Sequence, residues 1–294
     1  MNEAHAVLDR AGAERDRPEI LEQLRAETAT RVLPVRAGRA PLSADGLRLY
    51  PATDPAFAGD DVEWALLGRR ADGTAVLLAA LDRDAALDHD GSWADVRDAA
   101  ARLSPEETEI LVSGAALSGW LREAPFCPAC GTRAQLRQAG WSRRCPACGR
   151  EHFPRTDPAV IVAVESADGD RLLLGANANW RGAFYSCFAG FVEAGESLET
   201  TVHREILEEA GVRLRDLRYR SSQPWPYPRS LMIGFRATAV DESAALGDGT
   251  EIIDVRWLTR AEVGSALAGD GPVGLPGPAS IARALIRDWY EERA

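Results

Sequence analysis

The sequence contains no lysine, so all 34 of its basic side chains are arginines. This absence excludes Schiff-base chemistry, and it leaves arginine or neutral donors to make every side-chain contact with phosphate. The chain also lacks any apolar run of the roughly 18 residues that a membrane-spanning helix needs. Its first twenty residues are charged and show no signal-peptide pattern. We therefore expect a protein of the reducing cytoplasm with no membrane partner.

Positive charge is scarce relative to negative charge. The 294 residues have a formal net charge of −11 and a sequence pI of about 5.0. A surface this acidic repels duplex DNA and anionic membranes, so neither is expected as a partner. An anionic ligand must then be met by a local basic patch or by a metal ion.

The chain divides into three regions, which we assign as domains 1–122, 123–155 and 156–294. In the first, VEWALLGRR and AVLLAALD flank the turn ADGT and predict a β-hairpin. Ser104, with Glu107 three residues later, predicts the start of a helix. The region shows no catalytic constellation, so we expect it to be a structural or dimer-forming domain.

The second region contains two copies of the pentapeptide CPACG, which give the pattern C-x2-C-x14-C-x2-C. Two such pairs predict a tetrahedral zinc site formed by Cys127, Cys130, Cys145 and Cys148, with disulfides or a redox dithiol as alternatives. All four ligands come from the protein, so the zinc is structural. A fifth ligand is not needed, although His152 is nearby.

The remaining cysteine and the arginines of the second region have simpler interpretations. Cys187 lies in the apolar segment FYSCFAG and is expected to be a core residue. Residues 127–155 carry six arginines and one glutamate, so this segment has a positive net charge although that of the whole chain is negative. This patch is either a solvated face or a local attractor for anions.

The third region alternates strands and helices. AVIVAVES, RLLLGAN, SLMIGFRATAV and DVRWLT predict strands, and SIARALIRDWYEER predicts a closing helix with apolar residues at 281, 285 and 289. Two helices interleaved with these strands predict an α/β sandwich.

The stretch GFVEAGESLETTVHREILEEAGV predicts a helix that begins near Ser197. Its buried stripe repeats in i, i+4 steps through Leu198, Val202, Ile206 and Ala210. Glu205, Glu208 and Glu209 cluster within about one turn on another face, where like charges destabilise a helix. Hard oxygens in this number suit Mg²⁺ or Mn²⁺, and Arg204 can orient a neighbouring carboxylate.

The spacing G-x5-E-x7-R-E-U-x-E-E-x-G-U, with U apolar, is complete in this chain. It is formed by Gly190, Glu196, Arg204, Glu205, Ile206, Glu208, Glu209, Gly211 and Val212. This pattern is the Nudix box, so the chain resembles Nudix hydrolases, which cleave nucleoside diphosphates linked to another group. A four-cysteine ribbon before the box and SQPWPYPRS after it are similar to the NADH pyrophosphatase and NAD-capped RNA hydrolase subfamily.

This resemblance implies a fold and an activity. The expected fold is α/β (α+β): a Nudix α/β/α sandwich preceded by a zinc ribbon and a divergent Nudix-like N-terminal domain. The expected reaction is hydrolysis of NAD(H) to nicotinamide mononucleotide and AMP, and removal of NAD caps from RNA, by a homodimer. Metal ions would bridge the pyrophosphate oxygens while a carboxylate-oriented water attacks one phosphorus.

The resemblance also implies residue roles. The catalytic residues would be Arg204, Glu205, Glu208 and Glu209, and the catalytic Mg²⁺ or Mn²⁺ would be held by the Ala189 carbonyl, Glu205, Glu209 and Glu251. Phe191 and Phe153 match aromatics that sandwich the nicotinamide, the second from the other subunit. The other substrate-binding positions would be Gln223, Pro224, Trp225, Pro226, Tyr227, Pro228, Arg229, Ser230 and Ala282.

The prolines of SQPWPYPRS predict a stiff loop. Each proline fixes φ and pushes the residue before it into an extended conformation. Gln223, Trp225 and Tyr227 would then project on roughly one side and form a preorganised wall for a flat base.

Two other functions remain open from the sequence alone. One is a Nudix hydrolase of ADP-ribose or diadenosine polyphosphates, which needs no aromatic loop. The other is a nucleic-acid-binding regulator whose Nudix domain senses a ligand, which the net charge and the complete box disfavour. For capped RNA, we expect Arg143 and Arg144 of the ribbon to contact the strand.

Overall fold

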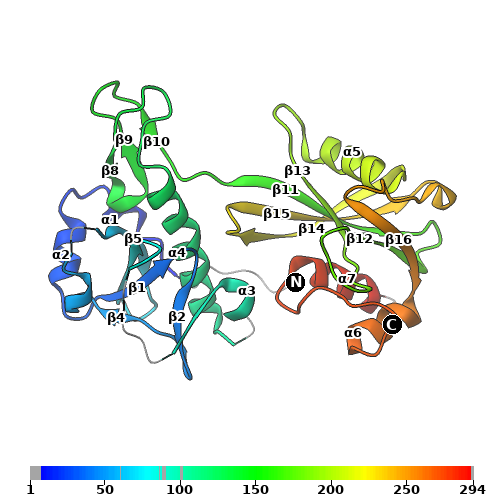
Figure 1. Cartoon of the computed structure of the whole chain (residues 1–294), viewed down its shortest axis with the longest axis horizontal. Helices are drawn as coiled ribbons and strands as arrows, with labels where there is room; N and C mark the ends of the chain where they lie inside the picture. Colours follow the sequence, from blue (N-terminus) through cyan, green and yellow to red (C-terminus); the bar gives the residue numbers. More distant parts are fainter. Residues whose placement is uncertain (1–7, 60, 86, 88–90, 100–101, 293–294) are drawn as a thin grey trace. The chain divides into compact units, whose positions relative to one another are not determined.

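The computed structural model describes residues 8–59, 61–85, 87, 91–99 and 102–292. These residues form two compact units (Figure 1). Unit 1 comprises Met1–Arg155 together with Pro226–Arg229, and unit 2 comprises Thr156–Trp225 together with Ser230–Ala294. Across the described residues, every helix is too short or too polar to cross a membrane.

Unit 1 is built on a mixed sheet with the strand order β4-β1-β6-β5, in which only β1 and β6 run parallel. The strands are β1 (Arg31–Arg36), β4 (Tyr50–Pro51), β5 (Glu63–Arg69) and β6 (Ala75–Leu81). The β5–β6 pair is the predicted hairpin, which is confirmed. A smaller sheet contains β2 (Ala40–Ser43), β3 (Gly46–Leu47) and β7 (Ser92–Ala94).

Helices cover both faces of the unit 1 sheet. Leu33 and Val35 pack with residues of α4 (Pro105–Glu123) on one face, whereas Val32 packs with Ile20 and Leu24 of α2 (Ile20–Ala26) on the other. The predicted helix start is confirmed, because Ser104 and Glu107 form a complete capping box. The short elements are α1 (Gly12–Arg15), η1 (Pro55–Phe57) and α3 (Val96–Ala99).

The cysteine-rich segment adds a three-stranded antiparallel sheet to unit 1. Its elements are β8 (Gln135–Arg137), η2 (Gln138–Gly140), β9 (Ser142–Arg144) and β10 (Glu151–His152). Gly140 has φ +91° and packs so closely on β5 that an added Cβ would lie 2.5 Å from the Ala65 Cβ. Trp141 donates its indole N–H to the Leu66 carbonyl at 2.7 Å. The ribbon is therefore fastened to the sheet of unit 1.

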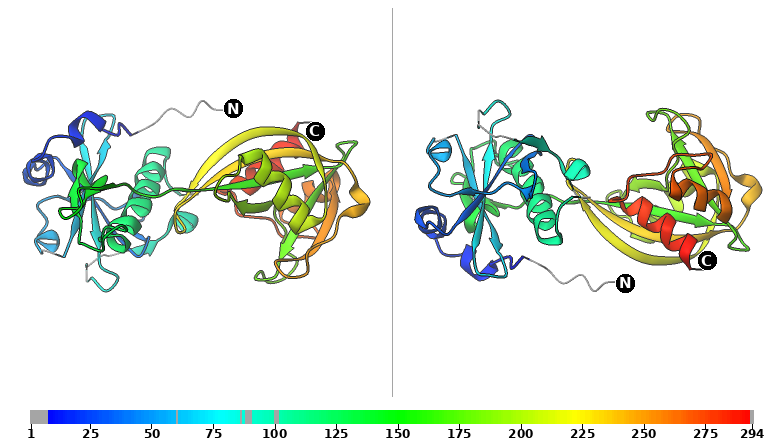
Figure 2. Two further views of the ribbon diagram at one scale, coloured as in Figure 1. Left: turned by 90° about the horizontal axis from the view of Figure 1, so that it is seen from above. Right: turned by 90° about the horizontal axis from the view of Figure 1, so that it is seen from below.

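Unit 2 contains the predicted sandwich. Its sheet has the order β14-β15-β11-β12-β16, and β13 pairs with β11. The strands are β11 (Asp157–Glu165), β12 (Arg171–Asn177), β13 (Phe188–Phe191), β14 (Leu214–Trp225), β15 (Ser230–Ala239) and β16 (Ile252–Thr259). Figure 2 shows α5 (Leu198–Ala210) on one face and α7 (Ile281–Glu291) on the other.

Strand β11 explains why both faces are covered. Val160, Val162 and Val164 pack with the core of α5, whereas Ile161 and Ala163 pack with the core of α7. A strand that is buried on both faces is apolar throughout, as AVIVAVES is. Sequence reasoning missed a third helix, α6 (Arg260–Ala268), although Thr259 and Glu262 form a capping box at its start. A short η3 (Glu242–Ala244) precedes β16.

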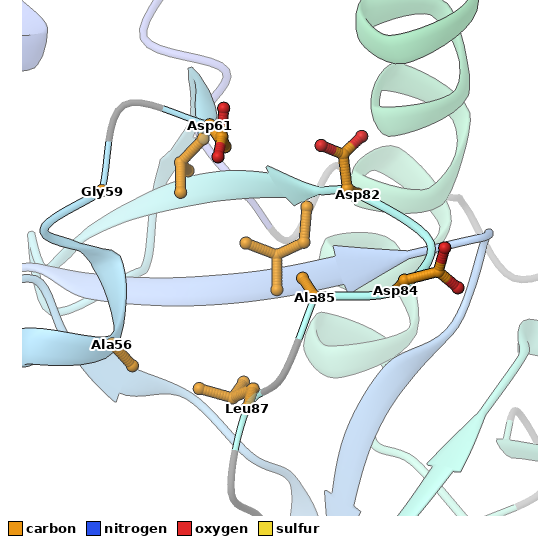
Figure 3. A pocket seen from close by; sticks show the side chains of 9 residues that line it. Ala56, Gly59, Asp61, Asp82, Asp84, Ala85 and Leu87 are labelled. Carbon is orange, nitrogen blue, oxygen red and sulfur yellow. The ribbon is translucent and has the colours of Figure 1, made fainter.

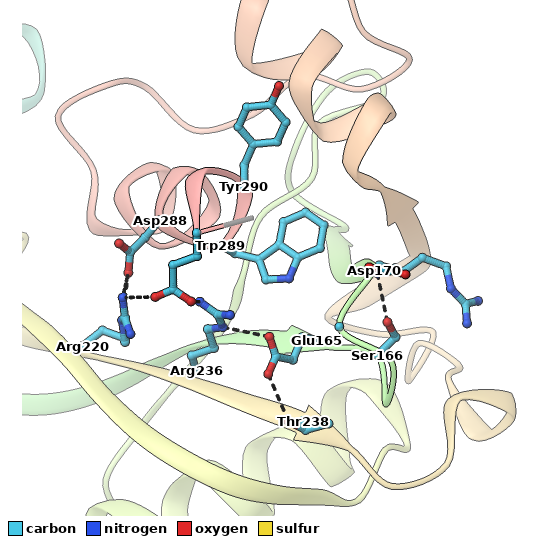
Figure 4. Close-up of polar contacts among 12 residues, drawn as sticks. Glu165, Ser166, Asp170, Arg220, Arg236, Thr238, Asp288, Trp289 and Tyr290 are labelled. Carbon is cyan, nitrogen blue, oxygen red and sulfur yellow. Dashed lines mark hydrogen bonds and ion pairs between the residues drawn. The ribbon is translucent and has the colours of Figure 1, made fainter. Parts of the chain in front are cut away.

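Charged side chains fasten the end of α7 to the sheet (Figure 4). Arg236, buried on β15, donates to Glu165 at 2.8 Å and to Glu292 at 2.5 Å. Arg220 on β14 bridges Glu292 and Asp288. Hydrogen-bonded pairs of this kind compensate the cost of burying the charges, and they fix the position of α7 on the sheet.

Candidate active site

The four predicted zinc ligands lie together in unit 1. The Sγ atoms of Cys127 and Cys148 are 3.6 Å apart, those of Cys130 and Cys145 are 3.4 Å apart, and all four lie within 4.8 Å of one another. A tetrahedral zinc with Zn–S bonds of about 2.3 Å requires sulfurs about 3.8 Å apart. The thiols are free rather than paired in disulfides. This set of donors fits one Zn²⁺.

Both cysteine knuckles use the same backbone geometry. The N–H groups of Gly131 and Gly149 donate to the carbonyls of Cys127 and Cys145, at 2.9 and 3.0 Å. The two glycines have φ +73° and +74°, a region that favours glycine. The repeated CPACG therefore encodes one turn twice.

A fifth residue also contacts the zinc site. His152 Nε2 lies 3.2 Å from Cys127 Sγ, which sequence reasoning set aside because four cysteines complete the ligand set. Outer-shell hydrogen bonds of this kind orient metal ligands, and their loss commonly lowers metal affinity 10- to 100-fold.

We expect His152→Ala to lower zinc affinity by about ten-fold or more, because Cys127 loses its imidazole partner. Competition against a chromogenic zinc chelator measures this loss. Cys145→Ser should abolish stoichiometric binding, and Arg144→Ala, which changes an exposed side chain on β9, should leave the affinity unchanged. Wild-type zinc affinity in His152→Ala would show that the contact is incidental.

In unit 2, α5 begins and ends where its sequence predicts. Ser197 is the N-cap and accepts the Thr200 N–H at 3.2 Å, and Gly211 is the C-cap with φ +68°. Val202, Ile206 and Ala210 are fully buried and Leu198 is partly buried against the same core, so the predicted stripe is confirmed except at its first residue.

Arg204 organises the carboxylates of this helix. It makes a bidentate pair with Glu196, at 2.7 and 2.8 Å, and donates to Glu205 at 2.9 Å and to Glu208 at 3.1 Å. It also donates to the Phe191 carbonyl at 3.0 Å, which ties the end of β13 to α5. The Arg204 hydrogen bonds lower the pKa of Glu196 to about 2, so that carboxylate stays ionised. Every arm of Arg204 is engaged within the protein.

Glu209 is the most unusual carboxylate of the group. It is 6% exposed, and its Oε2 has no hydrogen-bond partner among the described residues. Burial, followed by the charges of Glu251 and Glu205, raises the pKa of Glu209 to about 8. An orphaned buried oxygen beside two further carboxylates is the environment that a divalent cation would satisfy.

The main chain of β13 adds a donor beside Glu209. A backbone hydrogen bond from Ala189 to Glu209 opposes the rise of its pKa. In an antiparallel strand, the N–H and C=O of one residue point to the same edge. The Val192 N–H donates to the Pro158 carbonyl at 3.1 Å, and Ala189 lies at the alternate position of this ladder, so its carbonyl points away from β11.

Gly190 is the next residue of β13, and the packing at this position leaves no room for a side chain. A Cβ at this position would lie 1.9 Å from the Glu205 carboxyl carbon. Strand and helix can approach this closely only because the residue is glycine.

Glu251 is presented by a loop that sequence reasoning did not identify. Asp248 accepts the N–H groups of Thr250, Glu251 and Ile252 at 2.8 to 3.0 Å, which folds the chain ahead of β16. Asn177 donates to Glu251 Oε1 at 3.4 Å. The signal for this turn was an aspartate within GDGT.

Burial raises the pKa of Glu205 most, and the charges of Glu208 and Glu251 add to the rise, so Glu205, Glu209 and Glu251 repel one another. The carboxylate oxygens of these three glutamates do not all lie within 4.8 Å of one another. Among the described residues, only the four cysteine sulfurs form a possible metal-binding group that close. Carboxylate oxygens and a main-chain carbonyl are the donors that Mg²⁺ or Mn²⁺ prefers. The residues present therefore fit a divalent cation.

The proline-rich stretch differs from the predicted loop. Ser222–Trp225 belong to β14, and only Pro226–Arg229 form the turn to β15. Strand β14 is the edge of its sheet, where a proline such as Pro224 removes no ladder hydrogen bond. The prediction was wrong because the sequence does not say which strand lies at an edge.

Two of the three side chains expected to form one wall are hydrogen-bonded to main-chain groups. The Gln223 amide donates to the Ala279 carbonyl at 2.8 Å and accepts the Ile281 N–H at 2.8 Å, which fixes the start of α7. Tyr227 belongs to unit 1, where its hydroxyl accepts the Val96 N–H at 2.5 Å. Burial raises the pKa of Tyr227 to about 12. Gln223 and Tyr227 are therefore each engaged with main-chain groups, and the wall of Gln223, Trp225 and Tyr227 stays a prediction.

The remaining predicted substrate residues fall in both units. In unit 1, Phe153, 55% exposed, and the turn Pro226–Arg229 line one pocket of about 1060 Å³, large enough for a nucleotide. In unit 2, Phe191 is 55% exposed at the end of β13, Ser230 begins β15, and Ala282 is buried in the first turn of α7.

Two other predictions concerned individual residues outside this set. Cys187 is confirmed as a core residue, and burial raises its pKa to about 12. Arg143 does not form part of an exposed patch. It is 2% exposed and donates to Glu63 at 2.5 Å and to the Leu121 carbonyl at 2.7 Å. The expected RNA contact of Arg143 is therefore wrong, whereas Arg144 is exposed.

A smaller pocket of about 330 Å³ in unit 1 contains the carboxylates of Asp61, Asp82 and Asp84 (Figure 3). Asp82 pairs with Arg122, which also donates to the Asp61 carbonyl. The charge of Asp82 is therefore compensated within the protein, unlike that of the buried Glu209 carboxylate.

Comparison with known proteins agrees with these observations. Residues 122–153 match the model of the NADH pyrophosphatase zinc ribbon domain, and residues 155–274 match that of the NUDIX domain. The NAD-capped RNA hydrolase NudC of Mycobacterium bovis is 41% identical over 276 residues, 90% of this chain and 85% of that protein.

Two further matches are more partial. The human NAD-capped RNA hydrolase NUDT12 is 35% identical over 64% of this chain and 43% of its own length. A crystal structure of a NUDIX hydrolase from Nitrosomonas europaea covers 57% of this chain and 91% of that chain, with a TM-score of 0.43 and 23% identity. With the zinc ribbon, the complete box and the 41% identity over nine tenths of its length, the chain belongs to the NudC family of Nudix hydrolases.

Proposed function

We propose that this protein hydrolyses the pyrophosphate of NAD(H), giving nicotinamide mononucleotide and AMP, and that it removes NAD caps from RNA 5′ ends. The proposal is supported by its relatives, which are named NAD-capped RNA hydrolases. Among the features of the structure, the buried Glu209 carboxylate, with an orphaned oxygen beside Glu205 and Glu251, supports it most directly.

The carboxylate cluster would hold the catalytic metal. Ala189 through its carbonyl, together with Glu205, Glu209 and Glu251, would hold Mg²⁺ or Mn²⁺. The cation supplies charge neutralisation and Lewis acidity at the pyrophosphate. Arg204 is a positioning residue, because its arms hold carboxylates rather than ligand.

Water supplies the atoms that balance the reaction. Its oxygen forms a bond to one phosphorus, the bridging P–O bond breaks, and one proton leaves to a base. Glu208, which is 60% exposed and paired with Arg204 on the same face of α5, is the candidate that orients this water.

A substrate comparison tests the proposal. We expect kcat/KM for NADH to exceed that for ADP-ribose and diadenosine tetraphosphate by at least about ten-fold, in Mg²⁺ or Mn²⁺, with AMP and nicotinamide mononucleotide as products. The ribbon and aromatic turn are features that the other two substrates do not require. A higher kcat/KM for ADP-ribose would refute the assignment of substrate.

Three further proposals accompany this function. The protein acts as a homodimer in the cytoplasm, where its thiols stay reduced and free to bind zinc. Unit 1 contains a divergent Nudix-like domain, since its sheet, like that of unit 2, has one parallel pair and helices on both faces. Its role is structural, with Phe153 contributing to substrate binding.

A further inference from the structure

The loop between β12 and β13 carries an exposed aromatic and a cation that the proposed reaction does not use. Trp180 is 40% exposed, and Arg181 beside it is exposed and forms no hydrogen bond or ion pair with any described residue. Phe184 supports the indole in an edge-to-face contact, with ring centroids 5.0 Å apart and planes at 81°. The indole is held in place while part of its surface remains open.

The same loop contacts a proposed metal ligand. The Ala178 N–H donates to the Glu251 carbonyl at 2.8 Å, and Asn177 donates from its side chain to Glu251 Oε1 at 3.4 Å. Asn177 also accepts the Asn179 N–H at 2.9 Å, and the Trp180 N–H donates to the Asn177 carbonyl at 3.0 Å. The main chain of Trp180 therefore lies within about 10 Å of that of Glu251, since a residue spans at most about 3.5 Å.

An open ring beside an unpaired cation is the combination that binds single-stranded nucleic acid. The base stacks on the aromatic, and the cation meets a backbone phosphate. Free NAD(H) has no phosphate beyond its pyrophosphate, whereas an RNA carries a phosphodiester after its first nucleotide. In a chain of net charge −11, the exposed Arg181 offers a positive charge that no acidic side chain of the described residues compensates.

We propose that Trp180 and Arg181 bind the RNA strand that follows an NAD cap, by stacking on a base and contacting a phosphate. This inference rests on the proposed function, and it places RNA recognition beside Glu251 in unit 2. It also replaces the predicted path over Arg143, which is buried.

Two measurements test the proposal, beginning with binding. A fluorescent 5′-NAD-capped single-stranded RNA is titrated, by anisotropy, against protein carrying Glu209→Gln to prevent turnover. Trp180→Ala in this background should weaken binding at least about five-fold, and Trp180→Phe should retain most of it. Arg181→Ala should reduce the slope of log affinity against log salt by about 0.7, the value for one phosphate contact to a single strand.

The second measurement compares substrates in the otherwise wild-type protein. Trp180→Ala and Arg181→Ala should lower kcat/KM for capped RNA at least about five-fold and change that for NADH less than two-fold. Tyr219→Ala and Arg218→Ala are matched controls on β14 and should change neither. Tyr219 is likewise exposed and makes a similar edge-to-face contact, with Phe235, and Arg218 is likewise an exposed arginine.

The outcomes separate this inference from the proposed function. Unchanged RNA binding in both variants would overturn the inference whatever the enzyme hydrolyses. Equal losses on NADH and capped RNA would also overturn it, because the loop would then serve the dinucleotide. Wild-type protein that cleaves neither substrate would refute the proposed function, while the binding titration would still decide the role of the loop.

Discussion

Replacing Glu209 by glutamine should lower NADH turnover by about 10²- to 10⁴-fold while the protein remains folded. The substitution preserves the shape of a buried side chain but removes the charge beside Glu205 and Glu251. Loss of a metal ligand removes several kcal/mol of transition-state stabilisation, and each 1.36 kcal/mol is a factor of ten in rate. Steady-state kinetics with saturating Mg²⁺ or Mn²⁺ measures the loss.

The same variant should be more stable than wild type in the absence of metal. Burial raises the pKa of Glu209 to about 8, so the folded state binds a proton that the unfolded state releases near pH 4.5. Stability contributed by this proton is therefore lost as the pH rises from about 4.5 to 8. At pH 7 the cost is at most about 3 kcal/mol. In EDTA, the Tm should fall less between about pH 4.5 and pH 8 for Glu209→Gln than for the wild type.

Glu199→Gln is the matched control for both measurements. Glu199 lies on the same helix but is exposed in its first turn, so its substitution should change neither turnover nor stability appreciably. Near-normal turnover in Glu209→Gln would remove Glu209 from the site.

The local signals in the sequence were reliable where they depend on neighbouring residues. Ser197 and Gly211 delimit α5 as expected, because caps are formed with residues only a few positions away. The two CPACG turns form in the same way, and their four thiols meet because the ribbon is short. These features could be predicted without knowledge of the tertiary fold.

Partners that are distant in sequence could not be predicted in this way. Arg143 is buried because Glu63, eighty residues earlier, accepts its hydrogen bond. Gln223 is engaged by the backbone around Ala279, and Tyr227 by the backbone of Val96. An arginine or an aromatic has the same local pattern whether it meets such a partner or a ligand.

The carboxylate site combines features that follow from the local sequence with features that depend on residues distant in sequence. The glutamates of α5 follow from helical periodicity, but the close approach of β13 depends on packing that the box pattern does not describe. Gly190 belongs to the box pattern, and the structure gives a geometric reason why this position is glycine. The glycine leaves room for the Glu205 carboxylate, which Arg204 holds at 2.9 Å.

Replacing Gly190 by alanine should lower turnover by about ten- to a hundred-fold and raise the metal concentration required for activity. The added Cβ would lie 1.9 Å from the Glu205 carboxyl carbon, so that side chain must move. Its rotation would break the hydrogen bond from Arg204, which also holds Glu196 and Phe191. Displacements of about 1 Å at a reacting centre can cost 100-fold in rate.

The loss in Gly190→Ala should come from the displaced carboxylate rather than from backbone strain, because Gly190 does not have a positive φ. We therefore expect partial recovery of turnover at high Mn²⁺, since a cation attracts Glu205 back toward the site. Gly12→Ala, in open space in unit 1, should have wild-type kinetics. Wild-type turnover and metal dependence in Gly190→Ala would show that Glu205 tolerates displacement, and would leave Glu209 and Glu251 as the carboxylates that set the metal requirement.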